Sequence, residues 1–475
     1  MEWVGLFLLL LVGLGIVLTG LPAVIVLFSV ASLGAVIGVL TDTIPVALLT
    51  ALPSRLINLL ENDLLQALPL YVTLGLLLDR LPVADSLYRS GVAILPRRAS
   101  APLFSGMLLG ALLGPMNGSV GASVIGLSRV VAPRLTAQGV PAATRDAVIA
   151  VASTLGVLVP PSLVLILLSD AMLGAHTIAV TATGRNDRVI NTLDIFRSAL
   201  VPAAILLALF LALSWIAGRS RSVAAPRTPL ARRELLLALV SFVFLIALLG
   251  GVAAGYFYAV EAAALGAFAL LCGGILSGVL TFRVLRALLA DAIAMSGALF
   301  SLLLAATSLT LILRLLGTDR LVNNLVAAIP GGDSAAVIVV LGVIALCAFV
   351  LDAFEIIFVI IPIVIPPLLI RVADARWVAV LVLLTLQASF LLPPFGYALM
   401  IMRGVAKNPA PFRNFLRALV PFLVVQWLVL MLVLAAPQLV HIGEDQKAIT
   451  RAPAKPFSDE DFKNALPPLS DPADQ

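Results

Sequence analysis

The chain has 475 residues, of which 61% are hydrophobic and only 12% are charged, and its mean hydropathy is +1.15. These values exclude an ordinary soluble domain and indicate a protein that crosses a lipid bilayer several times. The net charge of +5 does not point to nucleic acid, because the arginines stand in short clusters between apolar runs, as they do in loops that set membrane topology.

Few residues are suited to metal or redox chemistry. Cys272 and Cys347 both lie within apolar runs, where they are most simply small core residues and not a disulfide or a metal pair. His176 and His441 are far apart in the sequence, which argues against a zinc or haem enzyme. We find no histidine-based nucleophile motif, so we expect no enzyme activity.

Apolar runs of about 20 residues predict about ten membrane-spanning helices, two of them broken. The expected spans are 3–20, 22–41, 63–80, 144–175 (broken), 196–218, 233–254, 257–280, 288–316, 376–406 (broken) and 412–436. The first run follows Met1-Glu2 without a basic segment and leads directly into the second. We therefore interpret it as a retained span and not as a cleaved signal peptide.

Two further apolar segments, 101–134 and 334–370, carry small or polar residues at their centres. The first contains Pro115-Met-Asn-Gly-Ser119, and the second contains Asp352-Ala-Phe-Glu355. Each segment is long enough for two short helices, so we predict two re-entrant hairpins that enter the membrane and return to the same side. Arginine clusters flank the first hairpin at both ends, which places these ends in the cytoplasm and forces the second hairpin to open on the outer side.

A Pro-Pro pair interrupts each broken span. Each proline removes a backbone donor and clashes with the carbonyl four residues earlier, so Pro160-Pro161 should end a helix inside the membrane. The freed carbonyls find no water in hydrocarbon, and such breaks survive only where they are buried in protein or line a cavity. The alternative is an ordinary kinked helix packed against its neighbours.

The two breaks share a spacing with the two hairpins. Pro393-Pro394 follow Pro160-Pro161 by 233 residues, and the same offset places Asp352 on Ser119. This offset indicates an internal duplication, and the opposite directions of the hairpins make the repeats inverted, as is typical of secondary transporters. The predicted parts are a first repeat, a basic cytoplasmic linker, a second repeat and a polar disordered tail, at 1–218, 219–233, 234–440 and 441–475.

At these residues the chain resembles the large membrane subunit, or permease, of the tripartite ATP-independent periplasmic (TRAP) transporters. The likeness covers residues 1–436, and its clearest parts are Gly118-Ser119, ASTLGVLVPPS at 152–162, LDAFEII at 351–357 and SFLLPPFG at 389–396. It implies an elevator-type carrier in the bacterial inner membrane that uses a Na⁺ gradient and no other cofactor to take up a small organic acid. A periplasmic solute-binding protein would deliver the solute, and a small four-helix membrane subunit would brace the permease.

The resemblance also implies two sodium sites, each between a hairpin tip and a helix break. The first site would use Asn117, Gly118, Ser119, Thr154, Gly156 and Pro160. The second site would use Asp352, Gln387, Ser389, Pro393 and Gly396. The candidates for solute binding are Ser123, Ser162, Glu355 and Arg403. A stand-alone sodium–carboxylate symporter of similar architecture is the alternative, and a channel would instead need a continuous pore.

Some of these candidates could serve the fold and not bind an ion or solute. They are the candidates near the first tip and Glu355 at the second tip. Gly118 and Ser119 equally suit close helix packing, as small residues do in membranes. Either Asn117 or Ser123 could cap the second helix of the first hairpin. Glu355 is costly in so apolar a segment and is a functional candidate for that reason, but it could also pair with an arginine.

Two further positions weaken the match to the family's pattern of sites. Leu351 stands where the first tip has Gly118, so the second tip cannot use a left-handed glycine turn. Arg403 lies one turn before Lys407, which suits an anchor that reaches the cytoplasmic interface as well as a clamp on the solute.

Overall fold

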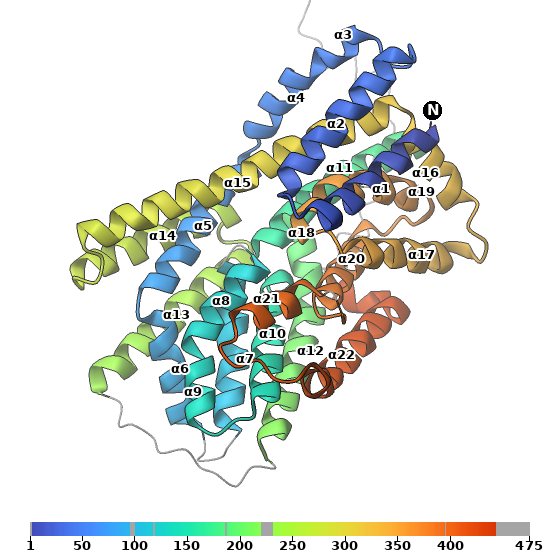
Figure 1. The fold of residues 1–475 in the computed structure, drawn as a ribbon. Coiled ribbons are helices and arrows are strands. Elements are labelled where there is room, and N and C mark those ends of the chain that lie inside the picture. The colour runs from blue at the N-terminus through green and yellow to red at the C-terminus, as the bar shows by residue number, and fades with distance from the viewer. Residues whose placement is uncertain are drawn as a thin grey trace, which may run out of the picture. The chain divides into compact units, whose positions relative to one another are not determined.

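Apolar runs become the long helices, two of which contain an internal proline, Pro202 and Pro421. The structure is a computed structural model that describes residues 2–95, 100–116, 119–185, 188–219, 231–394 and 396–442. Within these ranges every regular element is a helix (Figure 1). Most of the linker predicted at 219–233, and all but the first two residues of the tail predicted at 441–475, lie outside them.

The first half of the chain contains twelve α-helices among the described residues. They are α1 (Glu2–Thr19), α2 (Ala23–Leu40), α3 (Val46–Leu49), α4 (Ala51–Leu60), α5 (Ala67–Arg80), α6 (Val83–Ile94), α7 (Ala101–Leu113), α8 (Val120–Val130), α9 (Ala132–Ala137), α10 (Ala142–Leu158), α11 (Leu163–Thr183) and α12 (Thr192–Arg219). Short 3₁₀ turns at Asp63–Gln66 and Gly114–Met116 precede α5 and follow α7. Helix α1 ends before Gly20 and α11 before Gly184, and both glycines have a positive φ that an L side chain disfavours.

Ten α-helices follow in the second half. They are α13 (Arg232–Ala254), α14 (Ala259–Leu276), α15 (Phe282–Leu315), α16 (Thr318–Ala327), α17 (Gly332–Cys347), α18 (Ala353–Glu355), α19 (Ile361–Arg371), α20 (Ala375–Phe390), α21 (Tyr397–Val405) and α22 (Phe412–Ala435). One π-helical turn, Ile356–Ile360, joins α18 to α19, and a 3₁₀ turn at Pro437–Val440 follows α22.

The predicted class, an all-α polytopic membrane protein, is confirmed. Among the described residues, nine helices are long and apolar enough to cross a membrane, or ten if the bent pair α5 and α6 forms one span. One of the nine is 353–371, inside the second predicted hairpin, whereas the predicted spans 63–80 and 376–406 consist of shorter helices. Each predicted hairpin segment does form two helical arms around a turn, and its re-entry into the membrane stays a prediction.

Helices α10 and α20 lie at the centre of one group of helices. All residues from Arg145 to Leu158 in α10 and from Trp377 to Phe390 in α20 are buried. Helix α10 packs against α7, α8, α20, α21 and α22, and α12 packs against α7, α20 and α22 (Figure 1). A helix that is apolar on all sides is stable when other helices cover it, and these two helices carry the two breaks.

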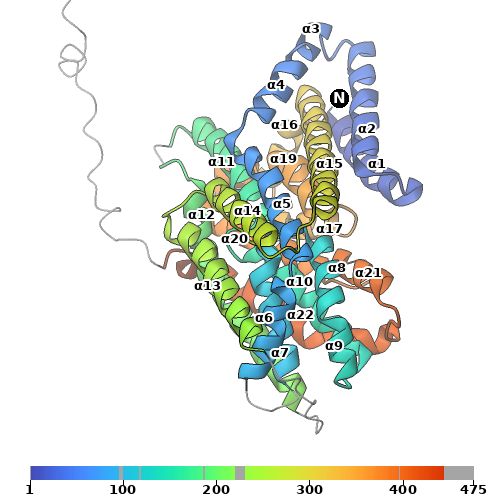
Figure 2. The same cartoon turned by 90° about the vertical axis from the view of Figure 1, so that its left-hand side faces the viewer.

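A second group of helices consists of α1, α2, α5, α6 and α13–α15. Helix α15 packs against α2 and α5, α14 packs against α5, and α13 packs against α6 (Figure 2). These helices expose large apolar side chains such as Leu236, Phe268 and Ile293, which are 61%, 67% and 73% exposed. Side chains of this kind suit contact with lipid.

Two features hold the central group together. The first is a glycine at every fourth position of the first hairpin arm, Gly106 and Gly110 on α7 and Gly114 in the 3₁₀ turn after it. A Cβ on Gly110 would lie 2.5 Å from the carbonyl oxygen of Ala152 in α10. The second is a buried ion pair, in which Arg145 Nε donates to Asp146 Oδ1 at 2.7 Å and Arg145 Nη2 donates to the carbonyl oxygen of Asn408 at 3.1 Å. The pair ties α10 to the loop between α21 and α22.

Candidate functional site

Ser119 begins α8 at the tip of the first hairpin. Its backbone is extended, and its Oγ accepts a hydrogen bond from the Ala122 N–H at 3.1 Å, which is the geometry of an N-cap. Ser123 Oγ donates to the Ser119 carbonyl oxygen at 3.1 Å. Ser119 is therefore the cap of this helix, whereas Asn117 and Gly118 lie outside the described residues.

The first helix break lies between Leu158, the end of α10, and Leu163, the start of α11. The Pro160-Pro161 peptide bond between them is cis. Ser162 caps α11, because its Oγ accepts from the Leu165 N–H at 3.1 Å, and it also donates to the Val157 carbonyl oxygen at 3.1 Å. Ser162 thus connects the two half-helices across the break.

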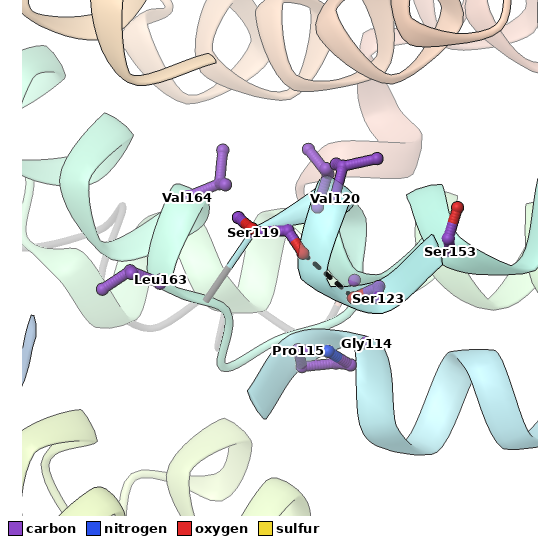
Figure 3. A pocket seen from close by; sticks show the side chains of 10 residues that line it. Gly114, Pro115, Ser119, Val120, Ser123, Ser153, Leu163 and Val164 are labelled. Atoms are coloured by element: carbon purple, nitrogen blue, oxygen red, sulfur yellow. Dashed lines mark hydrogen bonds between the residues drawn. The ribbon is translucent and has the colours of Figure 1, made fainter. Parts of the chain in front are cut away.

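A cavity of about 10 Å³, the space of about one water-sized sphere, lies between this hairpin tip and this break. It is lined by Gly114, Pro115, Ser119, Val120, Ser123, Ser153, Gly156, Val157, Leu163 and Val164 (Figure 3). The structure thus brings together Ser119, Ser123 and Gly156 of the predicted residues. Thr154, Pro160 and Ser162 lie next to this lining in the chain but are not part of it.

The hydroxyl groups at the cavity present lone pairs. Besides the Ser123 bond, Ser153 Oγ donates to the Ala150 carbonyl oxygen at 2.7 Å and Thr154 Oγ1 donates to the Val151 carbonyl oxygen at 2.8 Å. A carbonyl only accepts, so each of these hydroxyl protons is committed to its own helix and the oxygen keeps only acceptor capacity. The lining contains no charged side chain. Neutral oxygen acceptors in a small space favour a hard cation of low charge over an anion.

Backbone contact between two glycines forms one wall of the cavity. A Cβ on Gly156 would lie 2.4 Å from the carbonyl carbon and oxygen of Gly114. The two backbones therefore touch at this wall.

The sequence predicted Gly156 as a site residue but did not indicate Gly114, Pro115 or Ser153. The four-residue spacing of Gly106, Gly110 and Gly114 is the sequence signal that could have identified Gly114. Ser153 and Thr154 are adjacent in the sequence, and only the rotational phase of α10 determines which hydroxyl faces the cavity.

The second hairpin tip is built around two carboxylates. Asp352 Oδ1 accepts from the Ala353 N–H at 2.8 Å, and Glu355 Oε2 accepts from the Asp352 N–H at 2.9 Å, so the two side chains form a capping box at the start of α18. No described residue from 348 to 352 has a positive φ, so the tip turns without a left-handed residue at Leu351. In the described part of the chain no arginine forms an ion pair with Glu355.

The last turn of α20, just before the second break, contains a buried side chain without partners in the described structure. Gln387 is fully buried, and in the described structure neither its amide oxygen nor its amide nitrogen has a hydrogen-bond partner. Ser389 Oγ, by contrast, donates to the Thr385 carbonyl oxygen at 2.8 Å. An unpaired buried polar group costs about 1–3 kcal/mol, so a ligand at Gln387 would offset a real penalty.

Glycine is required where the second break returns to a helix. Beyond Pro393, the Gly396 N–H donates to the Leu392 carbonyl oxygen at 2.9 Å, and Gly396 is the N-cap of α21. A Cβ on Gly396 would lie 2.6 Å from the Phe390 carbonyl oxygen, which leaves no space for a side chain.

Arg403 lies at the opposite end of α21 from this break. Its Nη1 donates to the Ala410 carbonyl oxygen at 3.4 Å, and its guanidinium carbon is 5.2 Å from the centre of the Phe412 ring. These contacts are those of an anchor for the loop before α22.

Comparison with known proteins agrees with this architecture. A family described as "Tripartite ATP-independent periplasmic transporter, DctM component" matches residues 4–439. The chain is 22% identical over 407 residues to the C4-dicarboxylate TRAP transporter large permease protein DctM of Rhodobacter capsulatus, and the match covers 83% of this chain and 89% of that protein.

Two further proteins are similar. The sialic acid TRAP transporter permease protein SiaT of Haemophilus influenzae is 21% identical over 396 residues, which cover 82% of this chain and 61% of the longer relative. The crystal structure of the YdaH transporter of Alcanivorax borkumensis shares the fold, with a TM-score of 0.60 at 14% identity over 82% of this chain and 88% of that one.

We expect Gly156→Ala to push α7 and α10 apart, because its Cβ would collide with the Gly114 backbone. Overpacking of this kind destabilises by about 1–3 kcal/mol, so the thermal-unfolding midpoint should fall. Gly174→Ala is the control, because Gly174 is an exposed helical glycine with open space around its Cβ position. That variant should gain about 0.5–1 kcal/mol. Equal midpoints for the two variants would show that the glycine contact is not tight.

Proposed function

The chain belongs to the family of the DctM component of TRAP transporters, and we propose that it couples the uptake of an organic acid to the entry of sodium. Its homologues are large permease subunits of TRAP transporters, and the chain is a multi-pass protein of the bacterial inner membrane. The proposal concerns the ion, the solute, the partners and the motion.

The cavity beside the first break carries the proposal for the ion. Ser119, Ser123 and Ser153 offer neutral oxygen acceptors there, and the protons of the last two are already donated to backbone carbonyls. Na⁺ stripped of its hydration shell fits a space of one water-sized sphere and needs several oxygen ligands without a compensating charge. Asn117, Gly118, Thr154, Gly156 and Pro160 complete the proposed set.

The second proposed site uses the other tip and the other break. The unpaired amide of Gln387 is the observation that supports it, since an amide oxygen is a cation ligand and burial excludes water. Asp352 would contribute a carboxylate to this site, and its Oδ1 also caps the start of α18. Ser389, Pro393 and Gly396 complete this set.

The organic acid and the protein partners are proposed from the relatives. The printed names of two relatives refer to a C4-dicarboxylate and to sialic acid, and both solutes carry carboxylates. A periplasmic binding protein would deliver the solute, and a small four-helix membrane subunit would cover part of the apolar surface of the permease. The stand-alone sodium–carboxylate symporter is the alternative.

The arrangement of the helices supports an elevator motion. The central group, α7–α12 with α17–α22, contains both tips and both breaks, and it is fastened internally by glycine contacts and by the Arg145–Asp146 pair. The second group exposes its apolar side chains. We propose that the central group moves as one block against the second group and carries the ions and solute with it.

Ser153→Ala removes one oxygen acceptor from the cavity and should weaken sodium binding about tenfold, or about 1.4 kcal/mol. Equilibrium binding of radioactive sodium to the purified chain measures this change. Ser301→Ala is the matched control, because Ser301 Oγ donates to the Gly297 carbonyl oxygen at 2.7 Å in the same way but lies half-buried on α15, outside the cavity lining. A sodium affinity that is equal in both variants would remove Ser153 from the site.

The variant Gln387→Leu distinguishes two roles for Gln387, a ligand of the ion and a structural residue of the core. Without sodium, in choline chloride, the variant should be as stable as the wild type or more stable, because a buried unpaired amide that costs about 1–3 kcal/mol is gone. In sodium chloride the stabilisation by bound ion should be smaller than in the wild type. Thermal unfolding in the two salts at equal ionic strength measures both effects, and the reverse pattern would assign Gln387 to the core.

Uptake by proteoliposomes tests the tripartite system. Radioactive succinate, a C4-dicarboxylate, and sialic acid are the probes, each with its solute-binding protein present or omitted. We expect uptake of one of them only with an inward sodium gradient and only with the binding protein and the small subunit present. Uptake that does not change when the binding protein is omitted would favour the stand-alone symporter.

A further inference from the structure

Helix α15 of the second group contacts the second hairpin just beyond its tip. It packs against α18 and against the π-helical turn Ile356–Ile360 (Figure 1). Two side chains of α15 donate hydrogen bonds to the backbone of this hairpin arm. Thr310 Oγ1 donates to the Phe358 carbonyl oxygen at 3.1 Å. One turn further along both helices, Arg314 Nη2 donates to the Pro362 carbonyl oxygen at the longer distance of 3.5 Å.

The sequence of the hairpin arm explains why these two carbonyls accept bonds from another helix. In an α-helix the carbonyl of residue i accepts from the N–H of residue i+4. Pro362 has no N–H, so the Phe358 carbonyl lacks its α-helical donor, and Pro366 leaves the Pro362 carbonyl without one in the same way. Thr310 and Arg314 therefore replace, from α15, the two donors that proline removes from the arm.

The bond from Thr310 is buried, yet the hydroxyl has a second acceptor. Thr310 is 8% exposed, and its hydroxyl carries one proton. Oγ1 also donates to the carbonyl oxygen of Ala306, one turn earlier in α15, at 2.8 Å. When the Phe358 carbonyl moves away, the proton keeps its bond to Ala306. The contact can therefore break without leaving a buried hydroxyl unpaired, which is the property of a bond that forms in one conformation and opens in another.

We propose that Thr310 is a positioning residue that holds the second hairpin against α15 in this conformation and releases it when the central group moves. The inference rests on the proposed elevator motion, in which the hairpin belongs to the central group and α15 belongs to the second group. A slide of the hairpin along α15 must break the bond to Phe358. The bond thus stabilises the conformation described here relative to any in which the hairpin has moved.

A double-mutant cycle on the purified full chain tests the bond itself. Thr310→Val removes the donor at nearly constant shape and should lower the thermal-unfolding midpoint. Pro362→Ala supplies the Phe358 carbonyl with a donor from its own helix, so in that background Thr310→Val should lower the midpoint less. Ser308→Ala is the control, because Ser308 Oγ donates to the Leu304 carbonyl oxygen of α15 at 2.7 Å, and its effect should be equal in both backgrounds. An equal effect of Thr310→Val in both backgrounds would overturn the assigned bond.

Pulsed electron paramagnetic resonance tests the release. Spin labels are attached to cysteines introduced at Ile293 in α15 and Leu428 in α22, which are 73% and 61% exposed, in a chain whose Cys272 and Cys347 are replaced by alanine. We expect two populations of label distances, one of which matches the structure described here. Thr310→Val should reduce this population relative to the other by about twofold to tenfold, the effect of one hydrogen bond.

The outcomes of the distance measurement separate the role of Thr310 from the motion on which it rests. Ser308→Ala should leave the ratio of the two populations unchanged. A single distance in sodium chloride and in choline chloride alike would overturn the elevator motion and, with it, the release of this contact. Two populations whose ratio is the same in the wild type and in Thr310→Val would overturn only the role of Thr310.

Discussion

The structure depends on one constraint, namely that a helix broken inside hydrocarbon must find partners for the backbone groups it frees. Both broken helices, α10 and α20, are accordingly buried by other helices. Side chains at the tips and breaks then cap the new helix starts, as Ser119, Ser162 and Asp352 do. These caps satisfy N–H donors and leave oxygen acceptors unmatched. An excess of acceptors in a small space is suited to a cation, and on this ground we propose that a structural requirement of the fold also provides an ion site.

The same packing explains why ion binding can be linked to motion. Gly110 and Gly114 bring the backbone of the first hairpin arm against α10, so the cavity wall is formed by main chain that cannot adjust independently. The Arg145–Asp146 pair joins α10 to the loop after α21, and Tyr397 joins α21 to α8. These contacts join the first tip to the first break and to α21, which follows the second break. Interfaces of such packed units shift between discrete arrangements, which is the property an elevator mechanism requires.

Much of this arrangement was predictable from the sequence. Apolar runs revealed most of the spans, and the two Pro-Pro pairs revealed both breaks, because lipid imposes length and proline imposes interruption. Helices α4, α6 and α16 were missed because they are too short or too polar to span, and an apolar stripe on one face leaves no long apolar run. Ser153 was missed because its neighbour Thr154 has the same chemistry.

The central claim is that the cavity among Ser119, Ser123 and Ser153 binds sodium. High-resolution electron cryomicroscopy maps of the protein in sodium chloride and in choline chloride would test it most directly. We predict density in the cavity in sodium only, in contact with these oxygens and with backbone carbonyls of the hairpin tip and the helix break. Identical density in both salts, or none in either, would contradict the account.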